Sequence, residues 1–328
     1  MDKKTVFSGI QATSNQHLGN YLGAIKNWVE MQKQYDNYFC VVDLHTVTVP
    51  QDPDTLRANI REVAGLLFAA GIDEDNSTVF IQSHVKAHSE LAWLLNCITP
   101  MGWLHRMTQF KEKSEKAKDE VSVGLFDYPV LQAADILLYD TNLVPVGEDQ
   151  KQHVELCRDI AQRFNYRYGE VFVLPDAYIP PVGGRVMGLS NPDKKMSKSE
   201  EKKDDSIFLL DAPDQIRAKI KKATTDSHRE IKFDEKRSGV NNLLTIYQLV
   251  TEKTRDQIED HFAGKSYKDL KEQLAEAVIE TLEPLQQRYR ELTGEKGYLE
   301  AMLNRGAKRA EARAETKLRQ VYEKIGLR

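Results

Sequence analysis

The first half of the chain alternates short apolar runs with longer amphipathic stretches, and this order constrains the fold more than any other feature. The runs at 5–10, 38–45 and 77–83 are nearly continuous in apolar residues, as is typical of parallel strands that are buried on both faces. Helical patterns at 18–35 and 53–70 separate these runs, and the second opens with an Asp-Pro pair that favours a helix start. The alternation predicts a doubly wound parallel sheet, whose ligands bind beyond the carboxyl ends of the strands.

The alternation continues to about residue 203 and then stops. Further along the first half we expect helices at 89–97, 128–139 and 148–164, and a strand at 143–147. From residue 204 onward only helical patterns remain, and the final one, at 297–325, is rich in Ala, Glu, Lys and Arg. We therefore predict an α/β protein with a Rossmann-type catalytic domain at 1–203 and a helical domain at 204–328, whose last helix could pack back on the catalytic domain.

The composition is that of an ordinary globular protein, with 41% hydrophobic and 29% charged residues. No apolar run approaches the roughly 20 residues that cross a bilayer, and the N-terminal residues lack the apolar stretch of a signal peptide. We therefore expect a cytoplasmic protein with no membrane partner. The net charge of −4 neither favours nor excludes nucleic acid, and lysine clusters at 111–118, 194–203 and 219–222 leave tRNA open as a partner.

Cysteine and histidine spacings give no sign of a metal site. Cys40, Cys97 and Cys157 lack CxxC spacing and lie in apolar or helical contexts, so buried free thiols are expected rather than a disulfide or zinc site. His84 and His88 are four residues apart and could share a helix face, but no third ligand lies nearby. We expect both to be surface histidines.

The segment from Phe7 to Asn20 has the order strand, loop and helix start that binds phosphates in many proteins. Free N–H groups and the positive end of the helix dipole favour an anion there. Gly9 lets the backbone approach a nucleotide closely, Gly19 leaves room for an adenine or ribose, and His17 and Asn20 can donate hydrogen bonds to phosphate oxygens. The alternative is an ordinary turn between a strand and a helix, with glycines that serve packing.

A second motif, Lys195-Met196-Ser197-Lys198-Ser199, lies in a polar loop with turn signals and almost no apolar residues, so it is expected to be exposed and able to move. When a carboxylate attacks the α-phosphorus of ATP, charge shifts toward the departing pyrophosphate. Ammonium groups of Lys195 and Lys198 that approach only then would stabilise the transition state more than the ground state. The alternative is a basic surface loop, but the two motifs together predict ATP-dependent activation of a carboxylate.

Asp135 stands in an otherwise apolar helical stretch, where burial of a carboxylate without a donor is costly. It is either a structural acid with partners in the protein or an acceptor for a ligand. An indole N–H can only donate, so an acid suits it. A phenol would also suit a carboxylate, so this residue alone does not identify the ligand.

The segments FSGIQ, HLGNY, MTQFKEK, YPVLQAADILLY, VPVGEDQKQH and KKMSKS, in this order, resemble the bacterial tryptophanyl-tRNA synthetases, a family of class I aminoacyl-tRNA synthetases. TTDS and GVNNLL extend the resemblance into the helical half, so it covers nearly the whole chain. It implies a helical anticodon-binding domain, a homodimer, and the use of ATP with Mg²⁺ held through the ATP phosphates. It also implies the reaction: L-tryptophan is activated to tryptophanyl-adenylate with release of pyrophosphate, and is then transferred to the 3′ end of tRNA(Trp).

The positions of this chain that match the family's motifs imply which residues form the site. The ATP site would comprise Gln11, Ala12, Thr13, Gly19, Asn20, Gly147, Glu148, Asp149, Val186, Lys195, Met196, Ser197, Lys198 and Ser199. The catalytic groups would be His17, Lys113, Lys195 and Lys198. On the tryptophan side, Asp135 would accept the indole N–H, Phe7, Val144 and Val146 would wall the ring, and Tyr128 and Gln150 would hold the ammonium. His45 and Gln109 would lie near the carboxylate, with Gly9 and Gln132 also beside the substrate.

The chain departs from the family pattern at several positions, of which Gln132 matters most. It stands where the family commonly has Met, beside the expected indole pocket, and a polar amide there needs partners of its own. Three alternatives stay open from the sequence: a tyrosine-specific relative, a small-molecule nucleotidyltransferase that shares the nucleotide-binding half, and a non-catalytic relative that binds tRNA. The helical half argues against the second, and the intact lysine and histidine motifs argue against the third.

Overall fold

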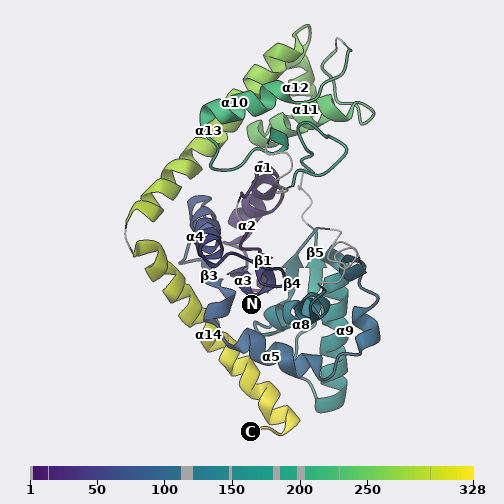
Figure 1. The fold of residues 1–328 in the computed structure, drawn as a ribbon, viewed down its shortest axis with the longest axis vertical. Coiled ribbons are helices and arrows are strands. Elements are labelled where there is room, and N and C mark those ends of the chain that lie inside the picture. The colour runs from purple at the N-terminus through teal and green to yellow at the C-terminus, as the bar shows by residue number, and fades with distance from the viewer. Residues whose placement is uncertain are drawn as a thin grey trace.

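A computed structural model describes residues 3–13, 15–111, 121–147, 150–179, 185–197, 204–228, 230–295 and 297–328 (Figure 1). The expected site residues Lys113, Glu148, Asp149, Lys198 and Ser199 lie outside these ranges.

Five parallel strands form one sheet in the order β3-β2-β1-β4-β5. They are β1 (Thr5–Ile10), β2 (Asp36–Val41), β3 (Ser77–Ile81), β4 (Leu143–Pro145) and β5 (Asp176–Tyr178). The order confirms the predicted Rossmann-type sheet, because the chain moves outward on one side through β2 and β3 and on the other through β4 and β5. Strand β5 was missed by the sequence pattern because it has only 3 residues and none is buried.

Helices cover the sheet between its strands, close to the predicted positions. They are α1 (Leu18–Asn20), α2 (Lys26–Met31), α3 (Asp43–Thr46), α4 (Pro53–Ala69), α5 (Ala87–Asn96), α6 (Met101–Leu104), α8 (Val123–Leu137) and α9 (Lys151–Tyr168), with a 3-10 turn η2 (Gln82–His84). A π-helical turn, η1 (Tyr21–Ile25), joins α1 to α2, where a single helix was expected. Helix α8 begins earlier than expected, because the Ser122 hydroxyl accepts a hydrogen bond from the Leu125 N–H at 3.1 Å.

Beyond β5 the described residues contain helices but no further strand of the sheet. These helices are α10 (Pro213–Lys222), α11 (Ser238–Thr251), α12 (Arg255–Phe262), α13 (Tyr267–Gly294) and α14 (Tyr298–Ile325). Figure 1 shows α10, α11 and α12 gathered at one end of the molecule, with α13 and α14 running from there along its flank toward the other end. The division into domains at 203/204 stays a prediction.

The core has two parts, one for each face of the sheet. Alternate residues of β2 divide between them: Phe39 and Val41 belong to one, whereas Tyr38 and Cys40 belong to the other. The part that contains Phe39 also includes buried residues of α4, α10, α11 and α13, so one face of the sheet and the helical half share a continuous core.

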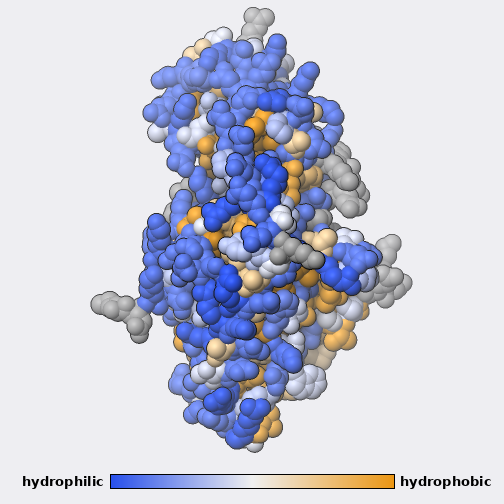
Figure 2. All heavy atoms as spheres, turned by 90° about the vertical axis from the view of Figure 1, so that its left-hand side faces the viewer, coloured by the Kyte–Doolittle hydropathy of each residue, from blue (hydrophilic) through white to orange (hydrophobic). Residues whose placement is uncertain are grey.

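Helix α14 packs against β3, the edge strand, and against α5. Contact with β3 is close at Gly306: a Cβ placed there would lie 1.8 Å from the Val79 carbonyl oxygen, so only glycine is compatible with this approach. The Arg305 guanidinium pairs with the Glu74 carboxylate at 2.9 Å, and Arg309 Nη1 donates to the Glu74 carbonyl at 2.7 Å. Figure 2 shows the flank of the molecule that carries α13 and α14, and most of its surface is hydrophilic.

Three expectations about single residues are wrong. His88 is fully buried rather than exposed, because it lies on the same face of α5 as Leu91 and Leu95. Cys97 is exposed, whereas Cys40 and Cys157 are buried free thiols as predicted. Lys219, one of the clustered lysines that left tRNA open as a partner, is buried, with its ammonium 2.6 Å from the Asp211 carboxylate.

No helix among the described residues is long and apolar enough to cross a membrane.

Candidate active site

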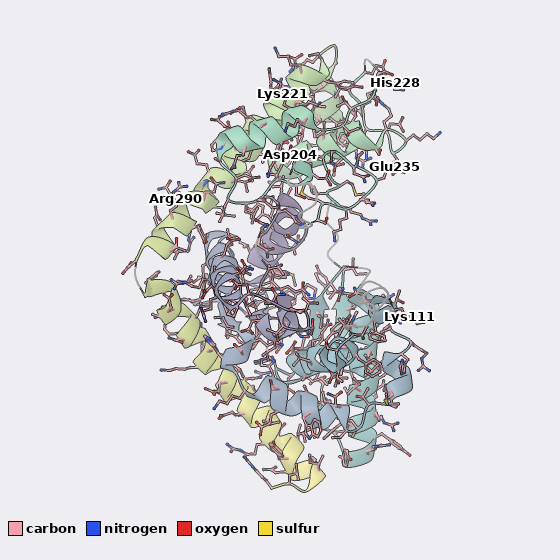
Figure 3. All side chains as sticks on the ribbon, viewed as in Figure 1. Lys111, Asp204, Lys221, His228, Glu235 and Arg290 are labelled. Carbon is pink, nitrogen blue, oxygen red and sulfur yellow. The ribbon has the colours of Figure 1, made fainter. Side chains whose placement is uncertain are left out.

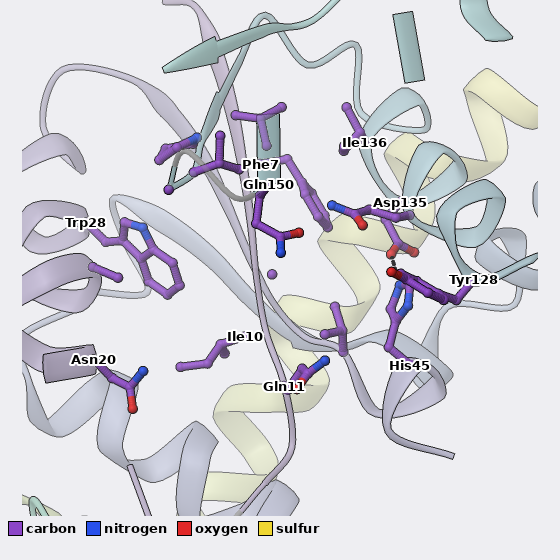
Figure 4. A pocket seen from close by; sticks show the side chains of 18 of the residues that line it. Phe7, Ile10, Gln11, Asn20, Trp28, His45, Tyr128, Asp135, Ile136 and Gln150 are labelled. Atoms are coloured by element: carbon purple, nitrogen blue, oxygen red, sulfur yellow. Dashed lines mark hydrogen bonds and ion pairs between the residues drawn. The ribbon is translucent and has the colours of Figure 1, made fainter. Parts of the chain in front are cut away.

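A cavity of about 590 Å³ opens at the carboxyl ends of β1 and β4, the two neighbouring strands from which the chain winds outward in opposite directions. Doubly wound sheets bind their ligands at this kind of position. Gly9 and Ile10 come from the end of β1, and Val144 and Val146 come from β4 and the turn that follows it. Figure 4 shows the side chains that surround the cavity.

All the residues expected on the tryptophan side line this one cavity, together with part of the expected ATP side. They are Phe7, Gly9, Gln11, Asn20, His45, Gln109, Tyr128, Gln132, Asp135, Val144, Val146, Gly147 and Gln150. Ala12, Thr13, His17, Gly19, Val186, Lys195, Met196 and Ser197 are described but do not line it.

Sequence reasoning missed several lining residues: Ile10, Gln16, Ala24, Trp28, Val42, Ile136 and Pro145. Gln16 is the most notable, because it is 1% exposed and its Oε1 has no hydrogen-bond partner among the described residues. Trp28, which stacks on Phe39 at 5.2 Å between ring centroids, gives the cavity a second aromatic wall opposite the end that holds Asp135 (Figure 4). The sequence did offer one sign of this role for Gln16, because it is a polar residue that directly precedes His17.

The Asp135 carboxylate lies at one end of the cavity and is 1% exposed. Its Oδ2 accepts a hydrogen bond from His45 Nε2 at 2.7 Å, and its Oδ1 accepts from Gln82 Nε2 at 2.6 Å and from His88 Nδ1 at 2.6 Å. Burial alone would raise the pKa of Asp135, but the charge of His45 and the hydrogen bonds from both histidines outweigh burial and hold the pKa well below its usual range. The group at this end is therefore an ionised acceptor.

Apolar and hydroxyl-bearing rings surround the space in front of Asp135. Phe7 and Val144 are buried and line the cavity, so together they form an apolar slot. The Tyr128 hydroxyl lies 2.9 Å from His153 Nε2 and 3.4 Å from Gln109 Oε1. Burial raises the pKa of Tyr128 to about 12, so its hydroxyl stays protonated at neutral pH. A flat ring with an N–H donor on its edge would fill the slot with its donor directed at Asp135.

The start of α1 was expected to bind phosphate, and there the side chains of His17 and Asn20 each form a hydrogen bond with the other residue's backbone N–H. His17 Nδ1 accepts from the Asn20 N–H at 3.2 Å, and Asn20 Oδ1 accepts from the His17 N–H at 3.1 Å, which is a capping box. The Leu18 N–H donates to the Ile207 carbonyl at 2.8 Å, so the first residues of the helical half pair with this loop. A neutral His17 ring therefore carries its proton on Nε2.

The polar loop that carries the Lys195 motif, here called the lysine loop, is also hydrogen-bonded to the helical half. Asn242, buried on α11, accepts from the Met187 N–H at 2.9 Å and donates to the Met187 carbonyl at 3.0 Å. Met187 forms an isolated antiparallel bridge with Lys195, whose side chain is exposed. The Ser206 hydroxyl donates to the Ser197 carbonyl at 2.7 Å. This arrangement fixes the described part of the loop and leaves the Lys195 side chain exposed.

Within the described ranges no group of three or more His, Cys, Asp or Glu side chains is placed to hold a metal ion. Mg²⁺ commonly keeps most of its waters and binds through substrate phosphates.

Gln132 lies one helical turn before Asp135 and lines the same cavity. No hydrogen bond joins its amide to another described residue. A ring bound beside it would have to desolvate this amide without replacing its hydrogen bonds. We therefore expect Gln132→Met, which keeps the volume, to lower KM for the ring-bearing substrate by about twofold to tenfold with little change in kcat. Steady-state kinetics of substrate activation would check this, and a raised KM would mean that the amide binds the substrate.

Comparisons with known proteins agree with one another. The model of the family of class I tRNA synthetases (W and Y) matches residues 2–283. A tryptophan–tRNA ligase of Wolinella succinogenes is 55% identical over 327 residues, which cover 100% of both chains. The solved tryptophanyl-tRNA synthetase of Mycoplasma pneumoniae has a TM-score of 0.90 at 37% identity, covering 99% of this chain and 98% of its own. That of Campylobacter jejuni, complexed with ADP and tryptophan, has a TM-score of 0.87 at 35% identity, covering 98% and 99%.

Proposed function

The chain belongs to the class I tRNA synthetases for tryptophan and tyrosine and is an aminoacyl-tRNA ligase, and on that premise we propose that it joins L-tryptophan to tRNA(Trp). The family and the ligase activity predicted from the sequence motifs are confirmed. Tryptophan and ATP would first give tryptophanyl-adenylate and pyrophosphate. The 3′ end of the tRNA would then take the tryptophanyl group and release AMP.

One observation carries the choice of amino acid: the cavity ends in a buried, ionised carboxylate that is walled by apolar groups. The indole of tryptophan is a large apolar ring with one N–H donor, so it can fill the slot and satisfy Asp135 at once. Tyr128 and Gln150 also line the cavity, with Tyr128 beside Asp135 and His45 (Figure 4), and their hydroxyl and amide oxygens could accept from the substrate ammonium.

The first step needs positioning and charge stabilisation rather than a protein nucleophile. A carboxylate oxygen of tryptophan attacks the α-phosphorus of ATP, a new P–O bond forms, and the bond to the bridging oxygen breaks with its electron pair leaving on pyrophosphate. Lys195 is exposed on a loop anchored by Met187 and Asn242, so its ammonium is able to approach the departing phosphates. We propose the same role for Lys198, and roles on the phosphates for His17 and Lys113.

We propose that ATP binds with Mg²⁺ on its phosphates. Gln11, Asn20 and Gly147 line the cavity and are the described residues that would face the nucleotide there. When bound, the ion would neutralise part of the phosphate charge.

The tRNA would lie along the length of the molecule, with its 3′ end at the cavity and its anticodon at the helical end. Lys111 lies on the part that contains the sheet, whereas Lys221 and His228 lie on the helical part (Figure 3). Lysine side chains on both parts, Lys111 and Lys221, suit contact with a long polyanion. The reaction's use of tRNA and ATP also supports a cytoplasmic location.

We propose that two copies of the chain form a homodimer through the surface of α5, α6 and the start of α8. Trp93, Met101 and Val123 are 69%, 65% and 77% exposed, and the helices that carry them contact one another. Large apolar side chains that gather on neighbouring elements are typical of a protein interface.

The proposed reaction is tested by exchange of labelled pyrophosphate into ATP with tryptophan or tyrosine, followed by charging of tRNA(Trp). We expect exchange with tryptophan, at least about 10³-fold weaker kcat/KM with tyrosine, and charging of the tRNA. Exchange with tyrosine alone would overturn the choice of amino acid. Exchange with neither would overturn the proposed function.

A further inference from the structure

Three donors already hold the Asp135 carboxylate before any substrate binds. Gln82 and His88 both donate to Oδ1, and His45 donates to Oδ2. A carboxylate offers about four acceptor positions, two on each oxygen. Oδ1 is therefore filled, and Oδ2 keeps one position on the side of His45, which lines the cavity.

A further layer of contacts fixes the donors on Oδ1. His88 is fully buried, and its Nε2 lies 2.8 Å from the Tyr139 hydroxyl. Burial raises the pKa of Tyr139 well above its usual value, so the hydroxyl keeps its proton and can donate to Nε2. The ring proton of His88 then lies on Nδ1, where the carboxylate requires a donor. Gln82 is held in the same way, because its Oε1 accepts from the Leu44 N–H at 3.1 Å.

Tyr139 also connects this layer to the wall of the cavity. Its ring stacks on Phe7 at 5.6 Å and on Tyr38 at 4.6 Å between centroids. Phe7 lines the cavity, whereas His88 and Tyr139 do not. One buried cluster therefore sets the position of the apolar wall and the direction of the acceptor together.

We propose that His88, backed by Tyr139, is a positioning residue that fills Oδ1 of Asp135 and leaves a single acceptor position on Oδ2, so that the cavity selects an aromatic ring with an N–H donor at one place on its edge. This rests on the proposed function and adds to it how the selection is made. A carboxylate that could rotate, or that had both oxygens available, would also accept hydrogen bonds from hydroxyl groups or from ordered water. The N–H of the substrate would then contribute less to its selection.

The test compares tryptophan with β-(3-benzothienyl)alanine, in which sulfur replaces the indole N–H and the shape is nearly kept. The measured quantity is the ratio of their kcat/KM values in pyrophosphate exchange, and we expect the unmodified protein to prefer tryptophan by about 10²-fold or more. His88→Leu removes the donor to Oδ1, and we expect the ratio to fall at least about tenfold. His88→Asn places an amide N–H near the position of Nδ1, and we expect the ratio to return to within about threefold of the unmodified value.

A purely structural role for His88 would lower activity with both amino acids equally and leave the ratio unchanged, and this result would overturn the proposal. An equal loss of the ratio in the Leu and Asn variants would also overturn it, because the Asn variant keeps the donor. If circular dichroism shows that His88→Leu does not fold, the Tyr139→Phe variant tests the proposal instead. It removes only the hydroxyl oxygen and is expected to lower the ratio of the two kcat/KM values by about threefold to tenfold. Absence of any tryptophan-dependent exchange in the unmodified protein would instead count against the proposed function.

Discussion

Replacing Asp135 by alanine is expected to lower kcat/KM for tryptophan in pyrophosphate exchange by about 10³-fold, because it removes the one charged acceptor among the described residues that line the cavity. The loss should fall on tryptophan and not on the nucleotide, so KM for ATP should change by less than about threefold. The variant also leaves His45, Gln82 and His88 without their acceptor. We expect that to cost roughly 3 kcal/mol of unfolding free energy, which chemical denaturation would measure.

The conservative change Asp127→Asn, on the same helix, is the matched control for Asp135→Ala. Asp127 accepts from Asn96 at 3.0 Å and does not line the cavity, so kcat/KM should stay within about threefold of the unmodified value. An equal rise in KM for ATP and for tryptophan in Asp135→Ala would mean that Asp135 only maintains the fold.

Removing the Lys195 ammonium by an alanine substitution is expected to lower kcat for adenylate formation by about 10²- to 10³-fold, while the dissociation constant for ATP changes by less than about threefold. The reason is that the side chain is exposed on its loop and would meet the phosphates only as charge develops on pyrophosphate. Rapid-quench measurement of adenylate formation together with equilibrium binding of ATP would separate the two quantities.

Lys194→Ala provides the control for Lys195→Ala, since Lys194 is its exposed neighbour and differs in position but not in charge. We expect this variant to keep kcat within about threefold. A large loss of ATP affinity in Lys195→Ala with kcat unchanged would contradict a role in the transition state and indicate simple ground-state binding.

The sequence predicted the sheet well wherever an apolar run was long. Strands β1, β2 and β3 each have five or six residues and most of them are buried, so their pattern was unambiguous. Strand β5 has no buried residue, and nothing in its composition distinguishes it from a loop. The helix cap at Asp52 was readable because the cap and its partner Thr55 lie in one short segment.

The cavity was predictable through the family motifs, but the network behind it was not. Asp135 obtains its donors from three segments, at His45, Gln82 and His88, that meet only in the folded chain. The spacing of His84 and His88 suggested two surface residues, yet the apolar positions on α5 show that His88 shares the buried face with Leu91. A histidine on an apolar helix face indicated burial, but its partner, the Asp135 carboxylate, lies 47 residues away in the sequence and could not be identified from the local pattern.

The close contact at Gly306 also has a consequence for how the protein is made. Strand β3 is synthesised early, and the sheet has all its strands once β5 at 176–178 is complete, but α14 at 298–325, which packs closely on β3, is made last. During translation the outer strand therefore presents unpaired backbone groups to other nascent chains for as long as the intervening residues are being added. The late synthesis of α14 therefore leaves this edge of the sheet open to pairing with another chain until the last helix is in place.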